Sequence, residues 1–129
     1  MRKILALILL IGLVDLSLEA ANHGPAAADI SGTWEFLLNL NKGVKPVTYV
    51  LKQQGENVTA TCCAPVETMT GYVRGNEVTF EKEKSTEGKN EKITYRGALE
   101  TTTKMVGTRT IIRDTEQIRQ KWTATKQDR

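Results

Sequence analysis

The sequence has few of the side chains that enzymes most often use for catalysis. Its 129 residues include one histidine, His23, and beyond position 29 only two serines, Ser31 and Ser85. With no histidine after position 23, the main part of the chain cannot form a Ser-His-Asp or Cys-His arrangement. Four glutamates that could pair as catalytic acids are predicted to face solvent: Glu35, Glu77, Glu81 and Glu83. We therefore expect that this protein is not an enzyme.

The chain also lacks a strong charge of one sign. Its net charge is +3, and lysines alternate with glutamates along residues 81–84 instead of gathering in one basic tract. Such a mixed pattern is typical of a solvated surface, so we expect no nucleic-acid partner. We also expect no cofactor and no metal ion, because cysteine and histidine are too scarce to complete a metal site.

Only one long hydrophobic run is present, and it lies at the N-terminus. A basic start at Arg2 and Lys3 precedes an apolar run over residues 4–14, which Asp15 ends. Eleven residues at a rise of ~1.5 Å cover about half of a ~30 Å hydrocarbon core, which suits a signal peptide better than a membrane anchor. We expect a signal peptide over residues 1–20, cleavage between 20 and 28, and a flexible tail over 21–29. The product is then exported, periplasmic or secreted, with no stable membrane insertion after cleavage.

From residue 30 onward, apolar residues alternate with polar ones and no helical period is seen. The first strand alternates from Ile30 to Leu40, Pro46 is expected to open the second, and the fifth is expected to project residues 81–84 into solvent. Residues 85–91 form the longest expected loop. Eight short strands in sequence indicate an all-β, antiparallel up-and-down meander over residues 30–126, and closing it into a barrel removes both exposed edges. Three glycines are expected to face inward, where they allow the strands to bend: Gly71, Gly97 and Gly107.

Several motifs occur in an order found in a known superfamily. They are DISGTW at 29–34, VTAT at 58–61, GYVRGNEVTF at 71–80 and WTATK at 122–126. In this the chain resembles the lipocalins (calycins), whose first strand carries G-x-W, and resembles small bacterial secreted barrels of that type. The resemblance implies an eight-stranded barrel in which Trp34 plugs one end and Lys126 lies over the Trp34 ring in a cation–π contact. The chain departs from the pattern in having Ala60 in place of a usual glycine and no C-terminal helix. A barrel this small can also be filled by its own side chains.

The adjacent pair Cys62-Cys63 allows two interpretations. On a strand, neighbouring side chains point to opposite faces, so relaxed geometry keeps the two sulfur atoms apart. The sequence favours a buried Cys62 with an exposed, unbridged Cys63. The alternative is a disulfide between neighbours, for which the turn beginning at Ala64 is the easiest place and which an oxidising compartment favours.

The clearest indication of a binding site is a polar pair expected inside the barrel. The alternation that buries Met105 and Ile111 also points Arg109 inward, and the alternation that buries Trp122 does the same for Gln120. A buried arginine needs a carboxylate, carbonyls, water or a ligand anion. The alternative, slightly favoured by the sequence alone, is a register slip at a bulge that places Arg109 outside. The candidate ligand-binding residues are Trp34, Tyr49, Tyr95, Arg109, Gln120 and Trp122.

Two functional hypotheses follow from these observations. The first is an exported barrel that carries a small hydrophobic or amphipathic molecule. The second is a barrel with a filled interior that acts as an envelope interaction or structural module without a ligand. An accessible interior cavity with polar groups that lack protein partners distinguishes the first hypothesis from the second.

Overall fold

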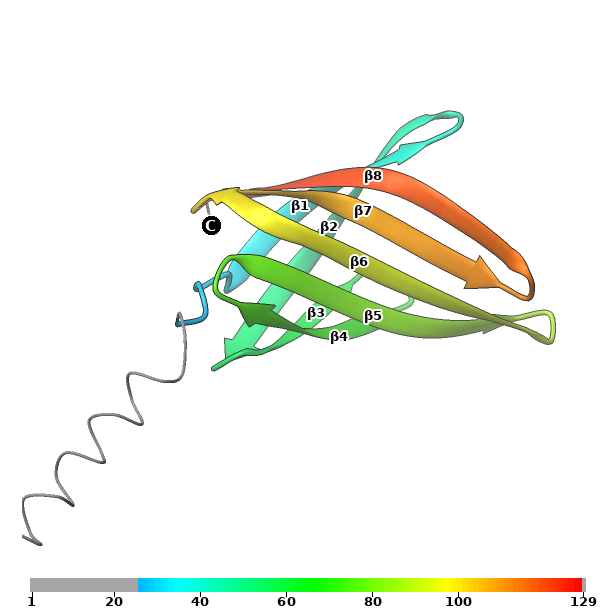
Figure 1. The fold of residues 1–129 in the computed structure, drawn as a ribbon, viewed down its shortest axis with the longest axis horizontal. Coiled ribbons are helices and arrows are strands. Elements are labelled where there is room, and N and C mark those ends of the chain that lie inside the picture. Colours follow the sequence, from blue (N-terminus) through cyan, green and yellow to red (C-terminus); the bar gives the residue numbers. More distant parts are fainter. Residues whose placement is uncertain (1–25, 129) are drawn as a thin grey trace, which may run out of the picture.

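The structure is a computed structural model, and it describes residues 26–128. The expected signal peptide and most of the expected tail lie outside this range. The eight strands follow one another around a closed barrel (Figure 1). They are β1 (Gly32–Leu40), β2 (Gly43–Gln54), β3 (Asn57–Cys62), β4 (Glu67–Arg74), β5 (Glu77–Thr86), β6 (Lys89–Thr101), β7 (Lys104–Arg113) and β8 (Glu116–Lys126).

The sheet closes on itself. Each strand pairs antiparallel with the next, and β8 returns to pair with β1, where Trp34 lies opposite Lys126 and Leu38 lies opposite Trp122. The predicted all-β, eight-stranded antiparallel meander barrel is therefore confirmed. Closure satisfies the backbone hydrogen-bonding groups that the first and last strands of an open sheet expose. Residues 26–128 contain no helix long and apolar enough to cross a membrane.

One end of the barrel is closed by the segment that precedes β1. Ile30 is fully buried, and the Trp34 indole Nε1 donates a hydrogen bond to the Ile30 carbonyl oxygen at 2.9 Å. Gln53 holds the same segment: its Nε2 donates to the Ala28 carbonyl oxygen, and its Oε1 accepts from the Ile30 amide, both at 2.8 Å. The Ala28 amide donates to the Gly75 carbonyl oxygen. The chain is thus fixed in place two residues before the expected start of the domain.

Two facing glycines let β6 and β7 approach closely. Gly97 and Gly107 are direct cross-strand partners. A Cβ atom on Gly97 would lie 2.2 Å from the Val106 carbonyl oxygen, and one on Gly107 would lie 2.0 Å from the Arg96 carbonyl oxygen. Neither position has room for a larger residue, in agreement with their expected role in bending the barrel.

At the opposite end, which we call the mouth, the structure corrects three predictions. β2 begins at Gly43, so Pro46 lies within the strand, in a part that pairs with β1 but not with β3. The long loop expected at 85–91 is a tight hairpin, because β5 runs to Thr86 and β6 starts at Lys89. Residues 81–84 do not all project into solvent, since Lys82 follows Phe80 on the inner face and its side chain is only 13% exposed.

Candidate functional site

The mouth of the barrel holds a cavity of about 550 Å³, which we call the cup. This volume is in the range of small-molecule sites. Its walls combine apolar and charged side chains, and basic groups outnumber carboxylates by four to two. The lining residues are Leu38, Lys45, Pro46, Val47, Thr48, Tyr49, Cys63, Glu67, Lys82, Lys84, Glu91, Ile93, Tyr95, Arg109 and Ile111.

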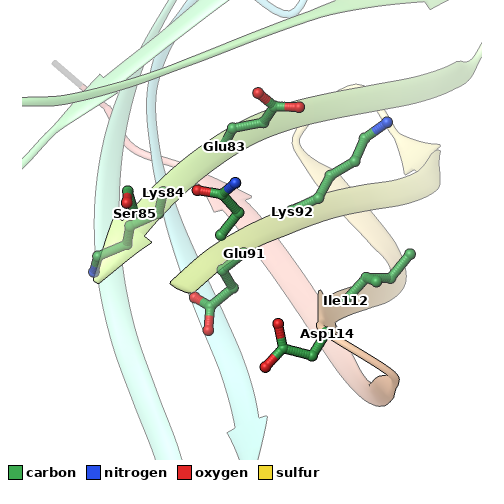
Figure 2. Close-up of a pocket in the computed structure, with 8 residues that line it drawn as sticks. Glu83, Lys84, Ser85, Glu91, Lys92, Ile112 and Asp114 are labelled. Atoms are coloured by element: carbon green, nitrogen blue, oxygen red, sulfur yellow. The ribbon is translucent and has the colours of Figure 1, made fainter. Parts of the chain in front are cut away.

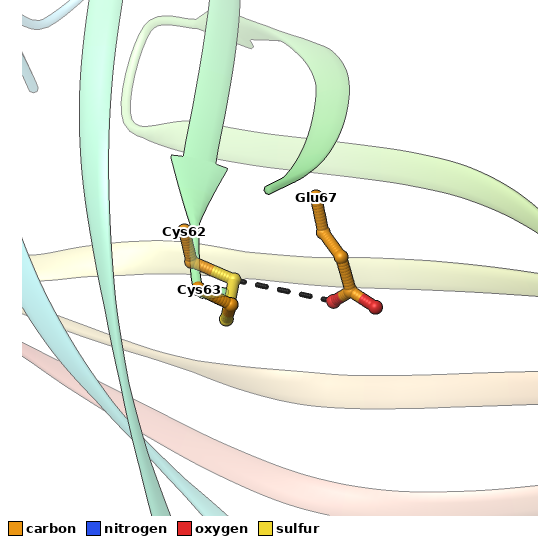
Figure 3. A group of neighbouring side chains, drawn as sticks. All are labelled: Cys62, Cys63 and Glu67. Atoms are coloured by element: carbon orange, nitrogen blue, oxygen red, sulfur yellow. Dashed lines mark hydrogen bonds between the residues drawn. A yellow bond between two sulfur atoms is a disulfide. The ribbon is translucent and has the colours of Figure 1, made fainter. Parts of the chain in front are cut away.

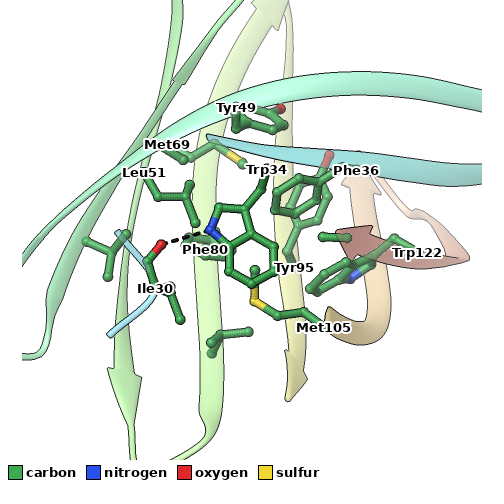
Figure 4. Packing of buried hydrophobic residues seen from close by; sticks show 14 of the residues in the cluster. Ile30, Trp34, Phe36, Tyr49, Leu51, Met69, Phe80, Tyr95, Met105 and Trp122 are labelled. Atoms are coloured by element: carbon green, nitrogen blue, oxygen red, sulfur yellow. Dashed lines mark hydrogen bonds between the residues drawn. The ribbon is translucent and has the colours of Figure 1, made fainter. Parts of the chain in front are cut away.

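A layer of aromatic rings forms the floor of the cup. Phe36 lies at its centre, with ring centroids 5.1 Å from Tyr49, 6.0 Å from Tyr95 and 5.2 Å from Trp122. All four residues are buried, and Figure 4 shows them next to Met69, Trp34 and Met105, which fill the barrel toward its closed end. Side chains therefore occupy the lower interior, and the space that remains is a shallow cup at the mouth.

Arg109 lies on the inner face of the barrel, so the register slip is excluded. It is the cross-strand partner of Gln120, and its Nε donates to the Gln120 Oε1 at 3.0 Å. Its Nη2 donates to the same oxygen, and its Nη1 donates to the Tyr95 hydroxyl at 3.1 Å. None of the ion pairs among residues 26–128 includes Arg109. The cup thus presents a half-buried guanidinium whose partners are neutral.

A second charged group, which we call the rim cluster, consists of Lys45, Glu67, Lys82 and Lys84. The Lys82 Nζ lies 3.2 Å from the Glu67 carboxylate, and the Lys84 Nζ lies 3.8 Å from it. The hydrogen bond and positive charge of Lys82, with smaller effects of Lys84 and Lys45, hold the pKa of Glu67 below its usual value. Glu67 is therefore ionised at neutral pH, and its carboxylate pairs with two lysines while Lys45 adds a weaker attraction at longer range.

The third charged group is a pair of oppositely charged residues nearer the hairpin tips. The Glu91 carboxylate accepts from the Arg113 Nε at 2.6 Å, and the Arg113 Nη2 lies at the same distance. This charge-assisted contact neutralises Glu91 locally. The positive charge that remains free in the cup is that of Arg109 and the rim cluster.

Tyr49 and Tyr95 contribute hydroxyl groups at the boundary between floor and cup. Burial, together with the neighbouring Tyr95, raises the pKa of Tyr49 well above its usual value. Tyr49 consequently stays neutral over the physiological pH range. The two tyrosines offer apolar rings to a ligand tail and neutral hydroxyls to a head group.

The structure places the six candidate residues at different depths. Tyr49, Tyr95 and Arg109 line the cup. Gln120 does not line it but holds the Arg109 guanidinium. Trp34 closes the far end of the barrel, beneath the floor, and Trp122 forms part of the floor itself.

Both tryptophans are buried, and neither lines the cup directly. The Trp122 Nε1 is the single buried side-chain nitrogen or oxygen in the described part of the chain that lacks a hydrogen-bond partner. Lys126 lies opposite Trp34 as expected, but its side chain runs along Gly32. The cation–π pairs in residues 26–128 are Arg74 with Tyr72 and Arg109 with Tyr95, so the implied Lys126–Trp34 contact is not formed.

Cys62 and Cys63 form a disulfide, which corrects the favoured interpretation of an unbridged pair. β3 ends at Cys62, and Cys63 has a φ of +76°, so the two residues do not keep the alternating geometry of a strand. Figure 3 shows the bridge beside Glu67, whose Oε2 lies 4.0 Å from the Cys62 Sγ. A disulfide sulfur carries no proton, so this is a contact and not a conventional hydrogen bond. These three residues could hold a soft metal ion only after reduction to thiols.

A second hollow, of about 520 Å³, runs along the hairpin of β5 and β6. Its wall includes Glu83, Lys92 and Asp114 (Figure 2), and Ile112 is its only large apolar side chain. All of its lining residues except Glu91 are exposed. Because this hollow lacks the apolar floor that a ligand tail needs, the cup is the better candidate site.

Sequence reasoning missed the rim cluster. The sequence predicts that Lys82 and Lys84 belong to a strand end that projects into solvent, and it indicates no role for Glu67. A strict period of two, continued from Met69 back to Glu67 and from Phe80 on to Lys84, places all three on the inner face. Glu67 and Lys84 also lie equally far from the hairpin at 74–77, and their side chains meet although the β4–β5 ladder ends at Thr70 and Glu81.

The fold and the cup define a class of protein: a closed, eight-stranded antiparallel barrel, compatible with a lipocalin-like fold and open at one end. No known protein family, no curated protein and no solved structure matches the chain, so the class is defined by the fold and the cup alone.

Proposed function

We propose that this protein is exported and that its barrel binds a small amphipathic anion in the cup, without catalysing a reaction on it. The observation that carries this proposal is the half-buried Arg109 guanidinium, which lines the cup without a carboxylate partner in residues 26–128. Keeping a charge partly out of water is costly unless an opposite charge compensates it. A ligand anion supplies that charge.

The remainder of the cup suits the apolar part of such a molecule. Leu38, Ile93 and Ile111 are buried residues that line its wall, and the Tyr49 and Tyr95 rings lie at its base. An acyl or aromatic tail can pack against these groups while the acidic head group meets Arg109. Because the aromatic floor blocks deeper entry, a short tail fits better than a long one.

The free positive charge of the cup sets the preferred ligand charge. Because Arg113, which does not line the cup, neutralises Glu91, the four basic lining residues and Glu67 leave three positive charges in the cup. A cation that has the same apolar tail as the anion is repelled by this excess positive charge. The proposal therefore requires that decanoate binds more tightly than decyltrimethylammonium, with decanol in between.

Native mass spectrometry of the protein exported with its own N-terminal segment gives a first test. A reproducible excess mass that is lost on denaturation supports the binding function. A bare protein that also fails to bind decanoate favours the second hypothesis, in which the barrel is an interaction or structural module.

The Arg109→Leu variant gives the sharper test by calorimetric titration with decanoate. Loss of hydrogen bonds to a charged group costs about 1.5–3 kcal/mol, which weakens binding by about 10- to 150-fold. Arg96→Leu is the matched control, because Arg96 is exposed and lies beside Tyr95 on the same strand. Equal decanoate affinity for the Arg109→Leu and Arg96→Leu variants contradicts the proposed site.

A further inference from the structure

The Cys62–Cys63 disulfide joins two consecutive residues. A disulfide stabilises a fold mainly by closing a loop in the unfolded chain, and the effect grows with loop length. A bridge between neighbours closes almost no loop, so it contributes little in this way. The stability of the barrel therefore does not account for this bridge.

Its position links the bridge to the cup. Cys63 is exposed and lines the cup, whereas Cys62 is 6% exposed and lies opposite Glu67 on β4. Glu67 in turn pairs with Lys82 and Lys84. A chemical change at the bridge consequently acts on one wall of the cup and on the rim cluster that sets its charge (Figure 3).

We propose that reduction of this disulfide by a dithiol weakens the anion affinity of the cup, which makes the bridge a redox switch for the proposed binding function. A thiolate of the dithiol attacks the exposed Cys63 Sγ, the bond between the two sulfur atoms breaks, and Cys62 leaves as a thiolate that takes up a proton. The second thiolate of the reductant then displaces Cys63. Two electrons and two protons pass to the protein, and the dithiol becomes a disulfide.

Charge is the first reason for the change in affinity. A free cysteine has a pKa near ~8.5, so the exposed Cys63 thiol is largely a thiolate at pH 9. Reduction therefore adds an acidic group to the wall of the cup, whereas Cys62 lies against the Glu67 carboxylate, which disfavours a second charge there. The Cys63 thiolate cancels one of the three surplus positive charges in the cup.

A change in the wall of the cup is the second reason for the lower affinity of the reduced form. Cys63 has a φ of +76°, a region that residues other than glycine rarely occupy. Once the bridge is open, Cys63 can return to an ordinary backbone conformation and move away from the cup. The oxidised form thus has both the more positive and the better-defined site, and a bound anion favours the oxidised form by linkage.

Decanoate titrations of the exported protein test the switch. Oxidised and dithiothreitol-reduced samples are compared at pH 6 and pH 9, and the gain of two hydrogens in the mass verifies reduction. Because one charge a few ångströms from the ligand is involved, we expect about tenfold weaker binding of the reduced form at pH 9. At pH 6 the thiols are neutral and the difference falls to about threefold or less.

The double variant Cys62→Ser, Cys63→Ser separates the two contributions, because it opens the wall but cannot form thiolates. Its affinity is expected to match that of the reduced protein at pH 6 and to show no additional loss at pH 9. Equal affinity of the oxidised and reduced forms at both pH values overturns the switch and leaves the binding function intact. Absence of decanoate binding in every form removes the proposed function and the switch together.

Discussion

Replacing Gly97 with alanine tests how tightly the barrel is closed around its aromatic floor. The new Cβ would lie 2.2 Å from the Val106 carbonyl oxygen and 2.8 Å from the Trp122 Cζ2 atom. A backbone carbonyl and a buried ring must both move, and overpacking of this kind costs about 1–3 kcal/mol. Part of the cost, about 0.4–1 kcal/mol, is offset because alanine has less freedom than glycine in the unfolded chain.

A net loss of about 1.3 kcal/mol follows for Gly97→Ala. For a domain of about 100 residues this lowers the melting temperature by about 5–10 °C. Thermal unfolding followed by circular dichroism measures the loss, and the near-ultraviolet spectrum reports whether Trp122 has moved. Gly55→Ala is the control: its φ of +61° also disfavours alanine, but no atom lies within 4 Å of the new Cβ.

The double variant with Gly107→Ala is expected to lose less stability than the sum of the single variants. The two glycines are cross-strand partners, and one separation of β6 from β7 relieves both contacts. A Gly97→Ala protein as stable as the wild type, with an unchanged near-ultraviolet spectrum, would refute the close packing described here.

Three further predictions concern the closed end and the rim cluster. Trp34→Phe removes the hydrogen bond to the Ile30 carbonyl and leaves a small void, at a cost of about 2–4 kcal/mol in urea unfolding. Gln53→Ala removes the contacts that hold the segment before β1, costs about 1–3 kcal/mol, and accelerates hydrogen exchange at the Ile30 amide. Glu67→Gln lowers stability at neutral pH. The pKa of Glu67 is depressed in the folded state by Lys82, so this deficit exists above the unfolded-state pKa, near ~4.3, and disappears as the pH falls through the folded-state value.

Each of these predictions has a result that contradicts it. For Trp34→Phe it is a urea midpoint equal to that of the wild type. For Gln53→Ala it is unchanged exchange at the Ile30 amide, with a core amide such as that of Phe80 as the internal reference. For Glu67→Gln it is a stability deficit that persists unchanged down to pH 2, or a deficit that grows on acidification.

Much of the architecture could be predicted from local patterns. The period of two from Ile30 onward predicted the strands. The alternation also pointed Arg109 inward, although the slightly favoured interpretation, a register slip that places Arg109 outside, is wrong. The turn at 113–116 also makes Arg109 and Gln120 equally distant from the hairpin tip, so their contact was within reach of sequence reasoning. These features depend on near neighbours along the chain.

The sequence predictions were wrong where the strand alternation was not applied to a charged residue, or was extended beyond the end of a strand. Residues 81–84 are expected in solvent, and Lys84 is exposed, but the alternation with Phe80 turns Lys82 inward, where its side chain is only 13% exposed. Lys82 and Lys84 both line the cup, because the mouth is open to water and tolerates charged groups. The cysteine pair was treated as part of a regular strand, but β3 ends at Cys62, and the change in φ at Cys63 lets the sulfur atoms meet.

The sequence by itself determined the strand order, the inward or outward position of most strand residues and the buried character of Trp34 and Phe36. Tertiary structure alone decided how deep the interior is. Closure between β8 and β1 brings Trp122 onto Phe36, and this pair with Tyr49 and Tyr95 forms a floor that fills the barrel below the mouth. The physical reason is that alternation specifies which face a side chain occupies, whereas the remaining space depends on how rings from four strands pack across the barrel.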